Sequence, residues 1–521
     1  MIRLDTAGGR TWLALGMGVL FSLLFCGLPF GVSVPLAAAA SLASAGLAAW
    51  SSGKRPAPSQ WLVAGAAVVF SLFFALRCAP ELSALNLALT VYLTFLAVSP
   101  WPEGRALEEF SAGDYAAVPP ALLSSSFRKG REEFGRLGER VEGLQLPVER
   151  IARGLVVALP VLFLLGLLMQ SADQVFDALT RRVFGSLAER APLHLGRFVT
   201  TACVATVFAG LYAWVRSEGP KPAAEGGWLK LVAGGSEKWS FVESAAAMGA
   251  VNLLFAAFAA VQGLFLLGGR KTIESLGVTY SDYARQGFWQ LVAIGVIVFV
   301  LSLVLEEKVE RTTARQKAIH KANLVLASAM TGLMMLSAFE RLSLYEEAYG
   351  FTVLRFYSHG FTVYLGAVFA LLAVKVLNEQ SRESFLHHSF LASLGLLFAW
   401  NALNPHLRIA ETNVRRHLEG RGQLDHAYLR GLSDDAIPAM VALASASPEA
   451  QRRSILLELD GRALALWKKA DYAWPAYHFG EASALKSYAG LLGAPRGLQK
   501  EEQLQTLHIE TEARARSARG G

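Results

Sequence analysis

Long apolar stretches, separated by shorter polar segments, dominate the first 404 residues of the chain. A transmembrane helix needs about 20 mainly apolar residues to cross the hydrocarbon core of a bilayer. Eleven stretches meet this requirement, so the pattern predicts an all-α, polytopic membrane protein with about 11 transmembrane helices. The predicted spans are residues 12–29, 33–50, 60–77, 82–99, 153–171, 197–215, 243–268, 287–305, 322–339, 358–378 and 386–403.

The composition changes after the last of these spans. Hydrophobic residues make up 53% of the 521 residues and charged residues 17%, which excludes soluble, disordered and disulfide-stapled proteins. Charged residues nevertheless rise to 26% over residues 405–521, against 15% before them. This shift predicts a transmembrane domain at 1–404, a small helical extramembrane domain at 405–496 and a disordered tail at 497–521.

The distribution of Lys and Arg predicts the orientation. If the N-terminus is inside, the segments assigned to the cytoplasm carry 22 Lys and Arg residues, and the opposite set carries 10. Positively charged loops stay in the cytoplasm, so the N-terminus is predicted to be cytoplasmic. Eleven spans then place residues 405–521 outside the cytoplasm, a conclusion that one miscounted helix would reverse.

The largest predicted cytoplasmic segment, 101–152, contains an amphipathic basic stretch at residues 128–140. Apolar residues recur there at helical spacing, with basic residues between them. The pattern predicts a helix that lies on the cytoplasmic leaflet and contacts anionic lipid. Regulated binding of a protein partner is the alternative. The basic residues are Arg128, Lys129, Arg131, Arg136 and Arg140.

The densest polar segment outside the spans is residues 339–360. Arg341, Tyr345 and Tyr349 are spaced four apart and share one helix face. Charges at membrane depth are costly unless they are paired or face water, so a functional site is the default hypothesis. Structural pairing of Glu340 or Glu347 with Arg355 is the alternative. The candidate ligand-binding residues here are Glu340, Arg341, Tyr345, Glu347, Tyr349 and Arg355.

Two further polar segments are predicted to lie on the same side. Asp173 follows the fifth predicted span, and the sequence LGVTYSDYARQGFWQL leads into the eighth. Because all three segments lie at outer helix ends, we expect one composite extracytoplasmic site, roofed by the C-terminal helices. An aromatic belt with a helix cap is the alternative. The further candidates are Asp173, Tyr280, Asp282, Tyr283 and Arg285.

The sequence predicts no cofactor, metal site or nucleic-acid partner. Cys26, Cys78 and Cys203 lie in or beside apolar stretches, without the spacing of metal ligands. The sequence also contains no glycine-rich phosphate-binding loop.

Three classes of function therefore remain open. The first is binding, transport or sensing of a small anionic or lipid-like ligand. The second is a membrane-embedded transferase that acts on a lipid-linked substrate, with Asp173, Asp282 or Glu347 as the general base. The third is a structural or signalling subunit with a membrane-protein partner.

Four motifs occur in a fixed order: SADQVF, LGVTYSDYARQGFWQL, LYEEAYGFTVLRFY, and ALNP followed by IAETNVRRHLEGRGQLDHAYLRGLSDDAIPAM. In this order they resemble a bacterial family of multi-pass membrane proteins, known only as domains of unknown function in the 4153/4173 group. The resemblance covers residues 153–445. It implies an integral protein of the bacterial inner membrane, and it brings no activity, substrate or catalytic residue.

Overall fold

The computed structural model describes residues 7–99, 106–142, 174–216, 240–274, 288–470 and 474–492, and across these ranges the chain forms helices and no β-sheet. Nine helices in the described ranges are long and apolar enough to cross a membrane. They match nine of the eleven predicted spans, so the prediction of an all-α polytopic membrane protein is confirmed. The predicted span 153–171 and the predicted tail 497–521 lie outside the described residues.

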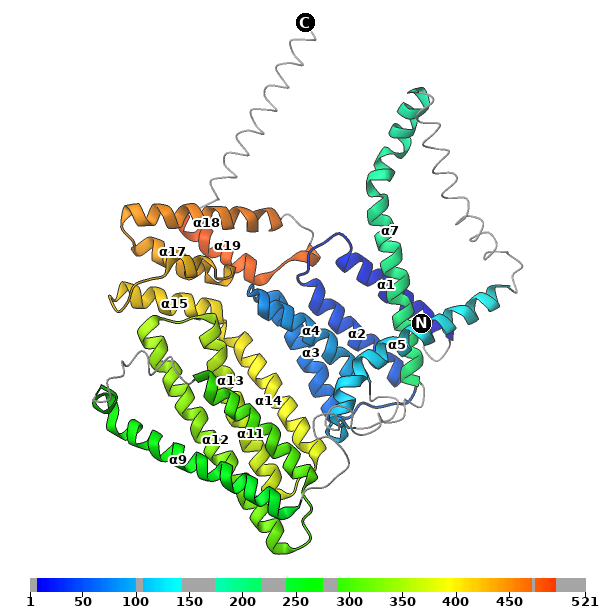
Figure 1. The fold of residues 1–521 in the computed structure, drawn as a ribbon. Coiled ribbons are helices and arrows are strands. Elements are labelled where there is room, and N and C mark those ends of the chain that lie inside the picture. Colours follow the sequence, from blue (N-terminus) through cyan, green and yellow to red (C-terminus); the bar gives the residue numbers. More distant parts are fainter. Residues whose placement is uncertain are drawn as a thin grey trace.

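The first group of helices consists of two antiparallel hairpins that pack against two further helices (Figure 1). Prolines begin α3 and α4, where a missing N–H costs no helical hydrogen bond. The members are α1 (Ala7–Phe25), α2 (Ser33–Trp50), α3 (Pro58–Leu76), α4 (Pro80–Val98), α5 (Ala112–Glu142) and α7 (Gln174–Arg216).

Helix α5 contains the predicted basic stretch 128–140 and packs closely against α7. A side chain at Gly130 would collide with the backbone of Thr206, and one at Gly210 with the backbone of Ser126. Two glycines therefore allow the two helix backbones to approach each other. The ammonium group of Lys129 lies 5.1 Å from the ring centroid of Trp214, which adds a cation–π contact to the same interface.

The second group surrounds its own apolar core, in which Leu324, Phe369 and Leu372 are almost fully buried. Polar side chains begin several of its helices. The hydroxyl of Thr313 caps α12, that of Thr352 caps α13 and that of Ser381 caps α14. The members are α9 (Phe241–Glu274), α11 (Phe288–Lys308), α12 (Ala314–Tyr349), α13 (Val353–Asn378) and α14 (Arg382–Leu403).

Helix α14 corresponds to the eleventh predicted span and joins the two groups. It is not among the nine strongly apolar helices, since His387, His388 and Asn401 lower its apolar character. Asn401 and Asn86 of α4 are both fully buried, and their amides exchange hydrogen bonds of 2.7 and 2.9 Å. A buried amide pair satisfies polar groups that neither lipid nor an apolar neighbour could satisfy.

The C-terminal helices form a layer over one end of both groups (Figure 1). This layer, here called the roof, has its own apolar core around Ile437, Leu443, Leu459 and Tyr488. The opposite end of the molecule is called the open side. The roof comprises α15 (Pro405–Leu418), α16 (His426–Arg430), α17 (Ile437–Ala446), α18 (Glu449–Ala470) and α19 (Phe479–Leu492).

Exposed tryptophans mark both ends of the bundle. At the open side Trp12, Trp50 and Trp61 are exposed, and at the roof side Trp289 and Trp474 are exposed. Tryptophan is enriched at the two membrane–water interfaces because its ring is amphipathic. The two sets are therefore placed where the two interfaces of a bilayer would meet this bundle.

Replacing one member of the amide pair should destabilise the protein more than its size change explains. We expect Asn86→Leu or Asn401→Leu to cost about 1 to 3 kcal/mol, because each leaves the other amide buried without a partner. The double substitution should cost less than the sum of the two. Thermal unfolding in detergent measures all three, and additive losses would show that the two amides do not depend on each other.

His478 predicts a pH dependence of roof attachment. Its Nε2 donates to the carbonyl of Phe74 at 2.9 Å, and its Nδ1 accepts from the N–H of Glu481 at 3.3 Å. Burial lowers the pKa of the His478 imidazole, because the charged form would lose its hydration. The stabilisation is thus fully present above the unfolded-state pKa of about 6.5 and is lost as the pH falls through the lower folded-state value.

Between pH 7.5 and pH 5.5 the unfolding temperature should accordingly fall further for the native protein than for His478→Gln. The control is His194→Gln, which removes an exposed histidine and should keep the native pH dependence. Equal slopes for the native protein and His478→Gln would contradict this account.

Candidate functional site

The roof side contains the described members of the predicted site. Arg355 lies in the first turn of α13 and stacks on Tyr345 of α12, with 4.1 Å between its guanidinium carbon and the ring centroid. Its Nη1 donates to the carbonyl of Gly350. The rings of Tyr345 and Tyr349 are in contact, with centroids 4.8 Å apart. Arg355 therefore holds the turn between α12 and α13 together.

The alternative hypothesis, pairing of Glu340 or Glu347 with Arg355, does not agree with the structure. Both carboxylates are exposed, and the structure gives neither an ion pair with Arg355. Gly350, at a φ of 82°, ends α12 and reverses the chain, which turns Arg355 towards the carbonyl of Gly350. Glu347 contributes a backbone carbonyl instead, which accepts from Arg416 of the roof. Arg341 is half-buried on the same helix.

A buried contact between a carboxylate and an imidazole in this segment involves two residues that are not among the predicted site residues. Glu346 is 5% exposed and lies 3.0 Å from Nε2 of His359 on the facing helix. Its second carboxylate oxygen and Nδ1 of His359 are buried without a hydrogen-bond partner. The sequence signal was the presence of both residues in the polar segment 339–360, but their pairing depends on how the turn aligns α12 with α13.

Five predicted residues cannot be placed against this segment. Their expected convergence on one cavity stays a prediction. Asp173, Tyr280, Asp282, Tyr283 and Arg285 lie outside the described residues.

A second polar network joins the roof to α4. Nε2 of His406 lies 2.7 Å from the carboxylate of Glu81, and its Nδ1 accepts from the N–H of Ser433 at 2.8 Å. The hydroxyl of Tyr357 donates to the same Glu81 oxygen at 3.1 Å. Because Nδ1 is an acceptor, Nε2 carries the proton and donates to Glu81. Both ring nitrogens of His406 have hydrogen-bond partners, so neither is free for acid–base chemistry. The network therefore holds the roof to α4.

An apolar groove opens on the roof side between α1, α7 and the segment that precedes α19. Its volume is about 490 Å³. Among the described residues that line it, Arg197 of α7 is the one with a charged side chain, and the Nε of this residue is buried without a hydrogen-bond partner. The other lining residues are Leu20, Leu23, Leu24, Cys26, Gly27, Leu28, Leu193, Trp474 and Pro475.

Arg197 is also absent from the predicted site residues. It begins the sixth predicted span and is one of the 10 Lys and Arg residues predicted to lie opposite the cytoplasmic set. A lone arginine within one turn of the end of an apolar span was the available signal. Leu20, Leu23 and Leu24 of the groove come from α1, and only the packing of α1 on α7 brings them to Arg197. A guanidinium group at the end of an apolar groove can bind an anionic headgroup while the groove holds a hydrocarbon chain.

The comparisons with known proteins identify a family without an assigned function. No curated protein and no solved structure matches the chain. Residues 64–443 match the family described as Domain of unknown function (DUF4153). This match covers most of the chain, from α3 to α17, and leaves α1, α2, α18 and α19 outside it. The chain therefore belongs to the DUF4153 family, whose members share a domain of unknown function.

Proposed function

We propose that this integral membrane protein binds an anionic, lipid-like ligand at the roof side, in the groove between α1 and α7. The observation that carries the proposal is Arg197, whose buried Nε has no partner at the end of an otherwise apolar groove. A buried guanidinium N–H without a partner is costly, and a phosphate or carboxylate group would remove that cost.

The shape and lining of the groove support an amphipathic ligand. A volume of about 490 Å³ suits a molecule larger than a simple ion. The leucines of α1 offer a hydrocarbon surface, and each buried CH₂ group of a ligand would contribute about 0.8 kcal/mol. Trp474 lines the groove and is exposed, and tryptophan rings are enriched at the level of the lipid headgroups.

The transferase alternative has less support. The most enzyme-like arrangement in the described part of the chain is that of Glu81, Tyr357 and His406. Its imidazole has no nitrogen left to accept or donate a further proton. Binding, transport or sensing therefore fits the described side chains better than catalysis.

We also propose the orientation and a second lipid contact. The excess of Lys and Arg in the open-side segments favours a cytoplasmic open side and an extracytoplasmic roof in a bacterial inner membrane. Arg128 and Arg131 are exposed on α5, which supports contact of this helix with anionic lipid of the cytoplasmic leaflet.

Removal of the groove cation should weaken anionic lipid binding. We expect Arg197→Gln to reduce retention of phosphatidylglycerol, measured by native mass spectrometry of the detergent-purified protein, by about 10-fold, since a charge-assisted hydrogen bond contributes about 1.5 to 3 kcal/mol. Retention of the zwitterionic phosphatidylcholine should change little.

The matched control is Arg408→Gln, which removes an exposed roof-side arginine outside the groove. Equal losses for the two variants would mean that anionic lipid responds to general surface charge, and the proposed site would be rejected.

The orientation has its own test. Reporter fusions after Ser59 and Arg382 should report the cytoplasm, and a fusion after Ala444 of the roof should report the outside. Arg382 begins α14 at the open side, and α14 leads to the roof at its other end. Reporters on the same side at Arg382 and Ala444 would overturn the proposed orientation.

A further inference from the structure

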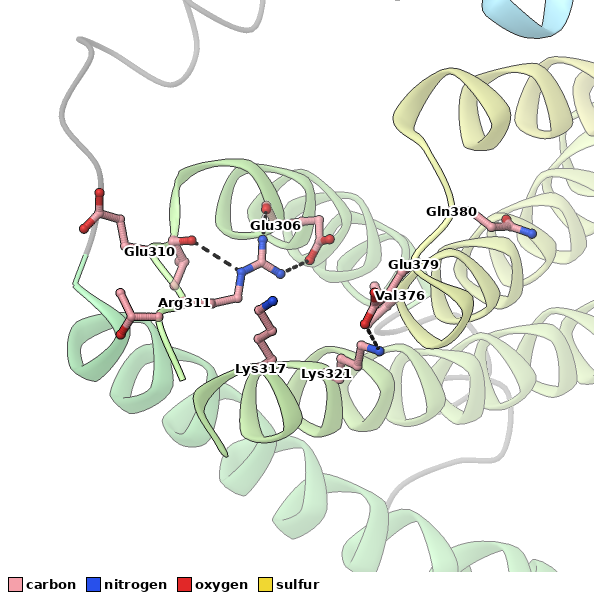
Figure 2. A pocket seen from close by; sticks show the side chains of 10 residues that line it. Glu306, Glu310, Arg311, Lys317, Lys321, Val376, Glu379 and Gln380 are labelled. Carbon is pink, nitrogen blue, oxygen red and sulfur yellow. Dashed lines mark hydrogen bonds and ion pairs between the residues drawn. The ribbon is translucent and has the colours of Figure 1, made fainter. Parts of the chain in front are cut away.

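A cavity of about 540 Å³ lies at the open side of the second helix group, at the end opposite the roof. Figure 2 shows the side chains that line it. The C-terminal end of α11, the first two turns of α12 and the C-terminal end of α13 surround it. Charged side chains dominate its lining. The lining residues with an acidic or basic group are Glu306, Glu310, Arg311, Lys317, Lys321 and Glu379.

One carboxylate of the cavity, that of Glu306, already has three basic partners. Glu306 lies 3.2 Å from Arg311, 3.3 Å from His320 and 3.3 Å from the buried Lys375. Nη2 of Arg311 also donates to the Glu306 carbonyl at 2.6 Å. Arg311 therefore has a fixed position, with its guanidinium plane held against the end of α11.

The lysines of α12 that line the cavity have fewer or weaker acidic partners than Arg311. The side chain of Lys317 points into the cavity towards Arg311 (Figure 2), and within the described ranges its ammonium group has no hydrogen bond or ion pair. Lys321 follows one turn later on the same face, and like charges at this spacing destabilise a helix. Its partner Glu379, 2.6 Å away, is 71% exposed. Exposed ion pairs of this kind contribute little, so a ligand can compete for Lys321.

We propose that this cavity is a binding site for a phosphate-bearing anion, held by Lys317 and Lys321 against the fixed guanidinium group of Arg311. A phosphate group between Lys317 and Arg311 would relieve the repulsion between two facing cations. The three guanidinium nitrogens of Arg311 already donate to Val309 and Glu306, so Arg311 contributes positive charge and its remaining N–H groups. The flexible lysines close on the phosphate oxygens. The site is independent of the groove at Arg197, because it lies on other helices at the opposite end of the molecule.

Two sources can supply such a group, namely a soluble phosphate compound and the headgroup of a lipid in the adjacent leaflet. Inorganic pyrophosphate tests the first, by isothermal titration calorimetry on the full chain in a nonionic detergent at low salt. Nanodiscs of phosphatidylglycerol, compared with nanodiscs of phosphatidylcholine, test the second by the unfolding temperature. Lys317→Gln is the test variant, since it removes a side chain whose loss breaks no described contact.

The matched control is Arg315→Gln, which removes an exposed cation two residues away that does not line the cavity. We expect Lys317→Gln to weaken pyrophosphate binding about 10-fold, or to abolish the stabilisation by phosphatidylglycerol, while Arg315→Gln behaves as the native protein does. Pyrophosphate binding identifies a soluble ligand, and a response to phosphatidylglycerol alone identifies a headgroup. Absence of both responses, or an equal effect of the two substitutions, would overturn the proposal.

Discussion

The ends of membrane-spanning helices leave backbone groups without partners, and satisfying these groups is the constraint on which the roof depends. The carboxylate of Asp435 accepts from the N–H groups of Cys78 and Ala79, just before α4, at 2.8 and 3.1 Å. Tyr428 accepts from the N–H of Val353 at 2.7 Å, at the start of α13. The roof therefore caps the bundle as well as covering it.

The same relation holds for carbonyl groups. His478 donates to Phe74 near the end of α3, and Arg416 donates to Glu347 near the end of α12. Asn413 both accepts from and donates to the backbone of Phe351, at 2.9 and 2.8 Å, in the turn between α12 and α13. These contacts reach both helix groups, so the roof fixes their relative position.

The sequence predicted the helices far better than the roles of their polar residues. Apolar length alone was sufficient for nine spans, because a helix that crosses a bilayer satisfies its own backbone within one continuous segment. The partners of Arg355 and Glu346 depend instead on the direction in which the chain leaves Gly350, and on which turn of α13 faces α12. Those are long-range geometric facts, and residue spacing within one helix does not contain them.

The Arg197 groove is a second feature that residue spacing within one helix does not predict. Arg197 and Leu24 are far apart in the sequence, and each alone resembles an ordinary residue near the end of a span. Their meeting requires α1 and α7 to pack together, with Gly18 of α1 against the backbone of Thr201. A glycine at this position permits the contact, but many transmembrane glycines serve other contacts, so the sequence alone does not assign its partner.

Charged side chains of two kinds occur in the described part of the chain, and the difference between them separates structural from ligand-binding roles. On the roof side, Glu81, Asp435 and Arg355 are each held by partners that fasten one helix to another. Charged groups that are paired in this way have few free hydrogen-bonding atoms for a ligand. Arg197 and Lys317 are different, because the first has a buried donor without a partner and the second faces a cavity without one. Because the polar groups at the helix ends mostly bind to other helices, the cations without such partners best indicate where ligands bind.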